Sequence, residues 1–383
     1  MAAIGNCLWR GDVALGALVG LTCLVLLRTA TAGSVPQRPN QDLNPVAFAD
    51  AGLELSPVSR LLALDVGLAG PPIVAADGTS WLAGRDGQLV RLAPNGTMQW
   101  AVGLGASLND GAALGGVGLL FISTAKNSIV AVQPDGSARW RSGAPWGIDG
   151  PLAWVPGQGL VFTGRDQYLY WLGLNARILQ RIRLQARRAA GPVAVGQGVA
   201  VGLESGELLV WDSPSRHTRW KLSQPIRTIV GVSPNHVLAL AGSEVHSIDA
   251  IPTMRWSREH VIALGVTTSD SQQVESATQV VTVRTSGQIE WFDWQGHVLA
   301  SVVAPELGAS GPVPEVVATR QCAWISSNAG SLWQCCSRDG IRKFQLTHAP
   351  LLRPVLDLSH RRLLVASSER EVWAIAVSAD MSD

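Results

Sequence analysis

A segment of about forty residues recurs along the chain, and this period constrains the fold more than any single motif. The stretch DGQLVRLAPNGTMQW (86–100) returns as KNSIVAVQPDGSARW (126–140). The apolar residue after the polar turn marks each copy, and it falls at Leu89, Ile129, Leu169, Leu208, Val245, Ile289, Leu332 and Val372. Successive markers are 37 to 44 residues apart, which is the period of a β-propeller blade.

Each copy has the pattern of four short strands separated by turns. In the first copy, apolar or alternating segments occupy 71–76, 79–84, 88–93 and 97–102. Asp-Gly and Asn-Gly pairs between them favour tight turns. The sequence therefore predicts an all-β fold, an eight-bladed β-propeller of four-stranded antiparallel blades, over residues 57–378.

The eighth copy has room for only three strands, because eleven residues follow Val372 and the last five (379–383) read as a polar tail. An apolar segment without a partner, VSRLLALDVG (58–67), lies at the other end of the predicted propeller. We predict that this N-terminal strand completes the last blade and closes the ring, since closure removes an exposed sheet edge.

Tryptophan is unusually frequent, with 15 residues, and four of them end predicted outer strands. These four are Trp100, Trp140, Trp220 and Trp256. A large flat ring at this place can pack between neighbouring sheets. Blades three, six and seven have Gln180, Ala300 and Lys343 instead, so their junctions are expected to depend less on tryptophan.

The first 32 residues (1–32) differ from the rest. An apolar run at 13–27 is followed by an ATA tripeptide at 30–32. This segment is predicted to be either a cleaved signal peptide or an N-terminal membrane anchor. The short run favours the signal peptide, whereas Arg28 favours the anchor. Either way the remainder is predicted to be exported, with residues 33–56 as a linker.

The copies resemble the PQQ-like β-propeller repeat, in which an apolar strand is followed by Leu-Asp, a Gly-containing turn and Trp. Asp212, Asp249 and Asp293 lie near the Leu-Asp position. Eight such blades in a short exported chain resemble the BamB-type scaffold of the outer-membrane protein assembly machinery. That family is normally a lipoprotein, whereas Cys23 here has no lipobox before it. The resemblance implies a periplasmic or outer-membrane-associated scaffold that binds envelope proteins.

No residue set in the sequence predicts catalysis, a cofactor or a metal. The seven His residues form no H-E-x-x-H motif, and a net charge of +1 gives no indication of nucleic-acid binding. GRDG (84–87) and SRDG (337–340) resemble parts of calcium loops, but Asp and Gly are expected in hairpin turns. We therefore predict a non-enzymatic protein with no catalytic, cofactor-binding or metal-binding residues.

Three alternatives remain open. The chain could be a subunit of another envelope machine, anchored by its N-terminal segment. It could be a PQQ-dependent dehydrogenase, because Cys335-Cys336 resembles the vicinal pair of some of those enzymes. The simpler interpretation of this pair is two thiols on opposite faces of one strand, and with Cys322 as the one other cysteine beyond the leader, no disulfide framework is predicted. Exposed tryptophans could instead bind glycans, the candidates being Trp146, Trp291 and Trp294.

Overall fold

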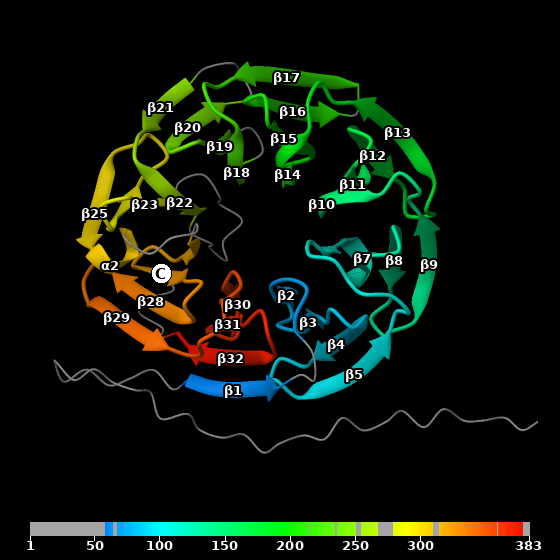
Figure 1. Ribbon diagram of the computed structural model, residues 1–383, viewed down its shortest axis with the longest axis horizontal. Helices are drawn as coiled ribbons and strands as arrows, with labels where there is room; N and C mark the ends of the chain where they lie inside the picture. Colours follow the sequence, from blue (N-terminus) through cyan, green and yellow to red (C-terminus); the bar gives the residue numbers. More distant parts are fainter. Residues whose placement is uncertain are drawn as a thin grey trace, which may run out of the picture. The chain divides into compact units, whose positions relative to one another are not determined.

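The computed structural model describes residues 58–377 apart from 64–66, 214, 234–235, 250–253, 267–278, 309–313 and 358. Eight four-stranded antiparallel sheets stand as blades around a central channel (Figure 1). The first strand of each blade lies near the channel and the fourth lies at the outer rim. This confirms the predicted eight-bladed propeller. The predicted leader (1–32), linker (33–56) and tail (379–383) lie outside the described residues.

The first four blades contain, from inner to outer strand, β2 (Ile73–Val74), β3 (Ser80–Ala83), β4 (Gln88–Leu92) and β5 (Met98–Gly103); β6 (Ala113–Leu114), β7 (Leu120–Thr124), β8 (Ser128–Val132) and β9 (Ala138–Gly143); β10 (Ile148–Val155), β11 (Gly159–Gly164), β12 (Tyr168–Leu172) and β13 (Ile178–Arg183); and β14 (Arg188–Val195), β15 (Gly198–Leu203), β16 (Glu207–Ser213) and β17 (Arg216–Lys221). A short 3-10 turn, η1 (Gly116–Gly118), precedes β7.

Blades 5 to 8 contain β18 (Ile226–Ser233), β19 (His236–Ala241), β20 (Glu244–Asp249) and β21 (Met254–Arg258); β22 (Val261–Val266), β23 (Val280–Arg284), β24 (Gln288–Phe292) and β25 (Val298–Val303); β26 (Glu315–Ala318), β27 (Cys322–Ser326), β28 (Ser331–Cys336) and β29 (Gly340–Gln345); and β30 (Val355–Asp357), β31 (Arg362–Ala366), β32 (Glu371–Ala376) and β1 (Val58–Ala63). One helical turn, α2 (Pro305–Gly308), follows β25.

The apolar core is divided among the junctions between blades. Eight clusters of buried side chains each combine residues of two neighbouring blades, from the junction of blades 1 and 2 round to that of blades 8 and 1. All eight residues that mark the sequence period lie in these clusters, and each is at most 1% exposed. The period of the sequence is therefore the period of the core.

The N-terminal strand closes the ring as predicted. β1 pairs antiparallel with β32, with Val58 opposite Ile375 and Ala63 opposite Glu371. Blade 8 therefore takes three strands from the end of the chain and its outer strand from the beginning (Figure 1). Antiparallel pairing satisfies the edge of β32 and joins the two ends of the propeller.

Three of the four predicted tryptophans connect their blade to the next one. The indole N–H donates to a carbonyl in the turn between the third and fourth strands of the following blade. The pairs are Trp100 to Pro134 (2.9 Å), Trp140 to Leu174 (2.7 Å) and Trp256 to Trp294 (3.0 Å). Glycines in two of these turns, Gly136 and Gly296, leave room for the ring, because an added Cβ would lie 3.2 Å from Trp100 and 2.8 Å from Trp256, respectively.

Trp220 is an exception, and its predicted equivalence is wrong. Trp100, Trp140 and Trp256 each lie opposite the residue two after the marker of their blade, whereas Trp220 lies opposite the marker Leu208 itself. Its indole nitrogen is buried without a hydrogen-bond partner among the described residues. In blades 1, 2 and 5 the extra residue of the bulge lies on the fourth strand, whereas in blade 4 the irregularity lies on the third strand, between Trp211 and Ser213, and this difference shifts the register.

Blades 3, 6 and 7 lack tryptophan at this position, as predicted, but the residue found there in blade 7 is not the predicted Lys343. Gln180 and Ala300 occupy the expected register opposite Trp171 and Trp291. In blade 7 the register position belongs to Arg342, because Lys343 lies one residue further, opposite Trp333.

The cysteines of blade 7 form a bond that the sequence interpretation missed. Cys322 and Cys336 lie opposite each other on β27 and β28 and are joined by a disulfide. Cys335 is a buried thiol whose pKa is raised to about 12 by burial. The two vicinal cysteines do face opposite sides of the strand, since Cys335 packs towards blade 6 and Cys336 towards blade 8. They are not bonded to each other.

The tryptophan contacts generate a prediction for the pair Trp140 and Trp220. Both W140F and W220F remove part of a half-buried ring, but only W140F removes a hydrogen bond between blades. We expect W140F to lower the free energy of unfolding by about 1 kcal/mol more than W220F. Urea denaturation followed by circular dichroism measures both, and an equal loss would contradict the role assigned to the Trp140 hydrogen bond.

Candidate functional site at the channel mouth

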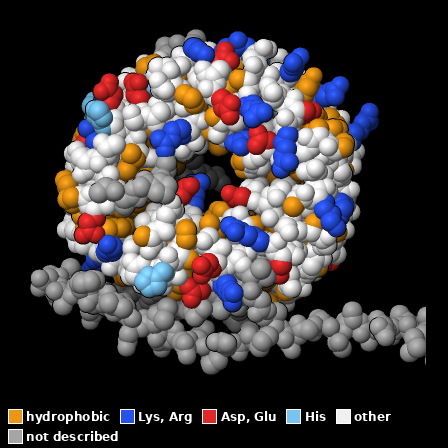
Figure 2. Space-filling view, viewed as in Figure 1, with side chains coloured by type: hydrophobic (Ala, Val, Ile, Leu, Met, Phe, Trp, Pro, Cys, Tyr) orange, Lys and Arg blue, Asp and Glu red, His pale blue; other side chains and the backbone are white. Residues whose placement is uncertain are grey.

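One face of the ring carries the inter-blade connections together with the turns between second and third strands. These segments share a face because antiparallel strands reverse direction at each turn. We call it the mouth face, since the inner strands begin there around the channel. Figure 2 shows the channel opening with acidic and basic side chains around it.

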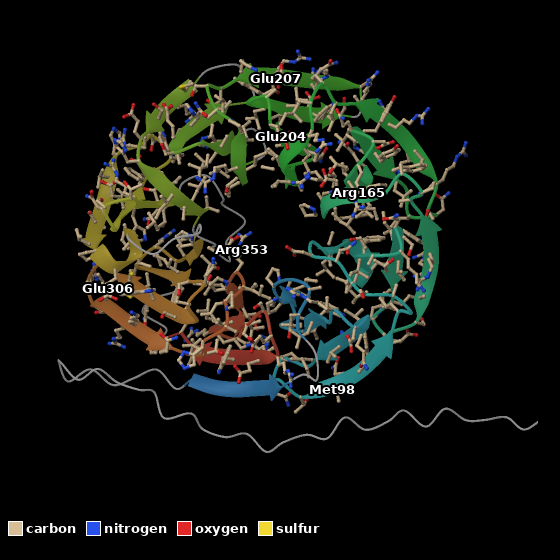
Figure 3. All side chains as sticks on the ribbon, viewed as in Figure 1. Met98, Arg165, Glu204, Glu207, Glu306 and Arg353 are labelled. Atoms are coloured by element: carbon tan, nitrogen blue, oxygen red, sulfur yellow. A yellow bond between two sulfur atoms is a disulfide. The ribbon has the colours of Figure 1, made fainter. Side chains whose placement is uncertain are left out.

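Charged residues occupy similar places where several inner strands begin. They are Asp110 before β6, Asp149 in β10, Arg188 in β14, Glu315 in β26 and Arg353 before β30. Figure 3 shows Arg353 extending from blade 8 towards the axis of the ring. Ring closure therefore brings side chains from five blades to one mixed-charge rim.

A basic pocket opens between blades 3 and 4 on the mouth face. It has a volume of about 250 Å³ and is lined by Asp149, Gly164, Arg165, Gln167, Leu184, Arg187 and Arg188. Arg188 forms an ion pair with Asp149, with 3.1 Å between the guanidinium nitrogen and the carboxylate oxygen. Arg165 and Arg187 are exposed and form no ion pair with a carboxylate among the described residues, so the pocket presents positive charge to an incoming group.

Backbone hydrogen bonds hold the walls of this pocket. The amide of Leu184 donates to the carbonyl of Gln167 (2.8 Å), and the amide of Glu204 donates to the carbonyl of Arg187 (2.9 Å). Gly150 gives the Arg188 side chain its space, because an added Cβ would lie 2.6 Å from the guanidinium carbon. The arginines are thus positioned by short connections between rigid strands.

An aromatic stack in the junction of blades 2 and 3 lies next to Gly164, one of the residues that line the pocket. Trp146 stacks on Tyr170 with 4.8 Å between ring centres, and Phe162 stacks on Tyr170 at 5.2 Å. The Tyr170 hydroxyl donates to the Asp166 carboxylate at 2.5 Å. Burial, followed by the hydrogen bond to Asp166, raises the pKa of Tyr170 well above its ordinary value.

Two carboxyl groups at the rim resist ionisation. Burial raises the pKa of Asp110, although the Gly111 amide opposes the shift. Burial also raises the pKa of Glu315, where Arg353 opposes the shift and Asp110 adds to it. Both residues are exposed, but the surrounding protein excludes part of the hydration of their carboxyl groups.

Sequence reasoning named no site residue, so the rim and the basic pocket were missed. A signal was present: Asp110, Asp149, Arg188, Glu315 and Arg353 each precede the marker of their blade by 17 to 20 residues. The number of residues between the charged residue and the marker varies from blade to blade, so the charged positions do not stand out as a repeat. Only ring closure reveals that residues of blades 2 and 7 interact.

The candidate glycan-binding tryptophans are not free aromatic platforms. Trp291 is fully buried in the core, so its predicted exposure is wrong. Trp146 is half-buried in the aromatic stack. Trp294 is half-buried and covered by the Arg255 guanidinium, 4.2 Å from the ring centre.

The predicted hairpin turns at 84–87 and 337–340 are present between second and third and between third and fourth strands, respectively. Asp86 accepts a hydrogen bond from the Gln88 amide at 3.0 Å and so stabilises its turn. Within the described ranges, no group of three or more His, Cys, Asp and Glu side chains is arranged to hold a metal ion.

Comparison with known proteins finds one similar in sequence over part of the chain. No family model matches the chain. The outer membrane protein assembly factor BamB of Nitrosomonas eutropha is 31% identical over 160 residues. That stretch is 39% of this chain and 38% of the relative, so the match spans less than half of either protein.

Solved structures share the fold over most of the chain. BamB of Moraxella catarrhalis has a TM-score of 0.67 and 18% identity, covering 86% of this chain and 99% of that protein. The computationally designed Ika8 protein has a TM-score of 0.63 and 12% identity, covering 82% and 99%. Sqt1 of Saccharomyces cerevisiae has a TM-score of 0.60 and 10% identity, covering 83% and 98%. The chain is thus a BamB-like β-propeller in fold.

Among the residues that the structure describes, no helix is both long enough and apolar enough to cross a membrane. The predicted signal or anchor at 1–32 lies outside those residues.

The raised pKa of Asp110 generates a prediction about pH. A carboxyl whose pKa is raised by folding stabilises the folded state when protonated, and this contribution is lost as the pH rises through the folded pKa. We therefore expect D110N to raise the Tm at neutral pH, with the gain disappearing below the ordinary Asp value of 3.8.

Asp135 supplies the control for this prediction. Hydrogen bonds from the Ser137 side chain and backbone lower its pKa, so D135N should give no gain in Tm at neutral pH. Differential scanning calorimetry across the pH range measures both variants. A Tm of D110N that stays below that of the unmodified chain at neutral pH would contradict the assigned cost of burying Asp110.

Proposed function

We propose that this chain is an exported, non-enzymatic scaffold that binds a protein of the outer-membrane protein assembly machinery through its mouth face. The observation that carries the proposal is the combined similarity to BamB, in sequence over part of the chain and in fold over most of it. The matched relative is described as an assembly factor. A ring of rigid blades suits this role, because it presents loops with little reorganisation on binding.

The basic pocket supplies the chemistry for the contact. Arg165 and Arg187 are exposed beside the Arg188–Asp149 ion pair. Guanidinium groups bind carboxylates through paired hydrogen bonds. An acidic segment of the partner is therefore the proposed ligand, and the neighbouring rim with Asp110 and Glu315 would favour a partner that also carries basic residues.

Site-specific photo-crosslinking in cells tests this proposal. A photoreactive amino acid replaces Arg187 on the mouth face or Arg338, which lies in a turn between third and fourth strands and so on the opposite face. We expect position 187 to capture the barrel protein of the outer-membrane assembly machinery and position 338 to capture it far less. Mass spectrometry identifies the product.

Two other outcomes decide against parts of the proposal. Capture of a different envelope complex from position 187 would make the chain a subunit of another machine. Equal capture of the barrel protein from both positions would contradict the mouth face as the docking surface. R165E should reduce the crosslink from position 187 if the pocket binds an acidic segment, because the substitution reverses the charge at its edge.

A further inference from the structure

The outer strands of blades 2, 3 and 4 form a strongly basic surface. Exposed Arg and Lys side chains project from β9, β13 and β17 and from the turn before β13, and none of these three strands contains Asp or Glu. We call this surface the basic wall, and it consists of Arg139, Arg141, Arg177, Arg181, Arg183, Arg216, Arg219 and Lys221. Figure 2 shows Lys and Arg side chains gathered along the corresponding part of the rim.

Most of the charge on the basic wall is not neutralised within the chain. Arg216 pairs with Asp212, and Arg219 pairs with Glu207 at 3.4 Å. The other six side chains form no ion pair with a carboxylate in the part of the chain that the structure describes. Arg181 instead lies over the Tyr168 ring, 5.4 Å from its centre.

Aliphatic side chains are exposed in the middle of the basic wall. Leu174, Ile178 and Leu179, all on blade 3, are 42%, 40% and 58% exposed. The Leu174 carbonyl accepts the Trp140 hydrogen bond, and Ile178 and Leu179 begin the strand that follows this turn. Large aliphatic groups in water are costly unless another surface covers them.

Blade 6 provides an internal comparison. Leu179 and Leu299 occupy equivalent positions, each at the bulge between the first and second paired residues of its outer strand. Leu299 is 51% exposed, close to the value for Leu179. The two strands differ in charge, because β25 has Ser301 and Val303 where β13 has Arg181 and Arg183. Exposed aliphatic groups therefore occur on both blades, but only blade 3 combines them with arginine.

We propose that the basic wall docks on an anionic membrane surface, with Leu174, Ile178 and Leu179 entering the headgroup region. Arginine binds lipid phosphate through paired hydrogen bonds, and basic side chains near an anionic bilayer each add to the attraction. Aliphatic groups beside them gain from burial at the boundary with the acyl chains. The combination fits a membrane better than an acidic protein segment, which would compensate the arginines but leave the aliphatic groups uncovered.

This contact goes beyond the proposed function and is compatible with it. The basic wall lies on the outer rim, whereas the mouth face surrounds the channel (Figure 1). A partner on the mouth face and a membrane against blade 3 can therefore be bound at the same time. The two proposals share only the envelope location, so one can fail without the other.

A fluorescent probe at matched positions tests the membrane contact. An environment-sensitive thiol dye is attached to L179C or to L299C in the full chain, with Cys7 and Cys23 replaced by Ser so that the buried Cys335 is the one other thiol. Vesicles of phosphatidylcholine alone or with phosphatidylglycerol are added. We expect the emission at position 179 to shift to the blue with phosphatidylglycerol vesicles, and the shift to weaken as salt increases.

Charge variants show whether the arginines are responsible. R177E/R183E should weaken the binding reported by the position-179 probe roughly thirty-fold, which corresponds to about 1 kcal/mol for each basic residue lost. The control, R320E/R338E, makes the same change in net charge at exposed positions on blade 7 and should leave the binding within about two-fold.

Three results would overturn the proposal. The first is an equal shift of emission for the dye at positions 179 and 299. Both variants carry the predicted N-terminal anchor and both positions are similarly exposed, so an equal shift would not depend on the basic wall. The second is a response that does not depend on lipid charge. The third is a response of position 179 to polyglutamate but not to vesicles, which would make the basic wall a surface for acidic proteins.

Discussion

Every blade of this ring has two apolar faces and cannot bury either of them alone. A four-stranded sheet offers side chains to both sides, and here each side packs against a neighbour, so that eight clusters occupy eight junctions. Removing one blade would expose two clusters and open the ring. The stability of the whole fold therefore depends on closure, and closure depends on the pairing of β1 with β32.

The rigid core leaves the two faces and the rim free to carry charge. Short connections tied by backbone hydrogen bonds hold the mouth face, as between Leu184 and Gln167. The outer strands need only alternate residues for packing, so the others can be arginine on blades 2 to 4 or aliphatic on blade 6. The fold thus separates the residues that make it stable from those that choose its partners.

Features that repeat could be predicted from the sequence, and features that depend on register could not. The marker residues repeat because each must fill the same place in the core. Their number predicts eight blades, and the missing fourth strand of the last copy predicts the closing strand. Trp220 shows the limit, because the bulge of blade 4 lies on the third strand and not on the fourth, and this shifts Trp220 out of line with Trp140. The Cys322–Cys336 disulfide needs the pairing of β27 with β28, and the rim needs Asp110 and Glu315 brought together across the ring. Neither pair of residues is separated by a number of positions that a repeat of the sequence would predict.

The closing strand also sets an order of events during synthesis. Residues 58–63 are synthesised about three hundred residues before their partners at 371–376. Blades can pair with their neighbours in the meantime, but both ends of the growing array keep an uncovered apolar face. The nascent propeller is therefore open to aggregation or to capture by chaperones until residues 371–376 have been made, and the pairing of β1 with β32 ends that period.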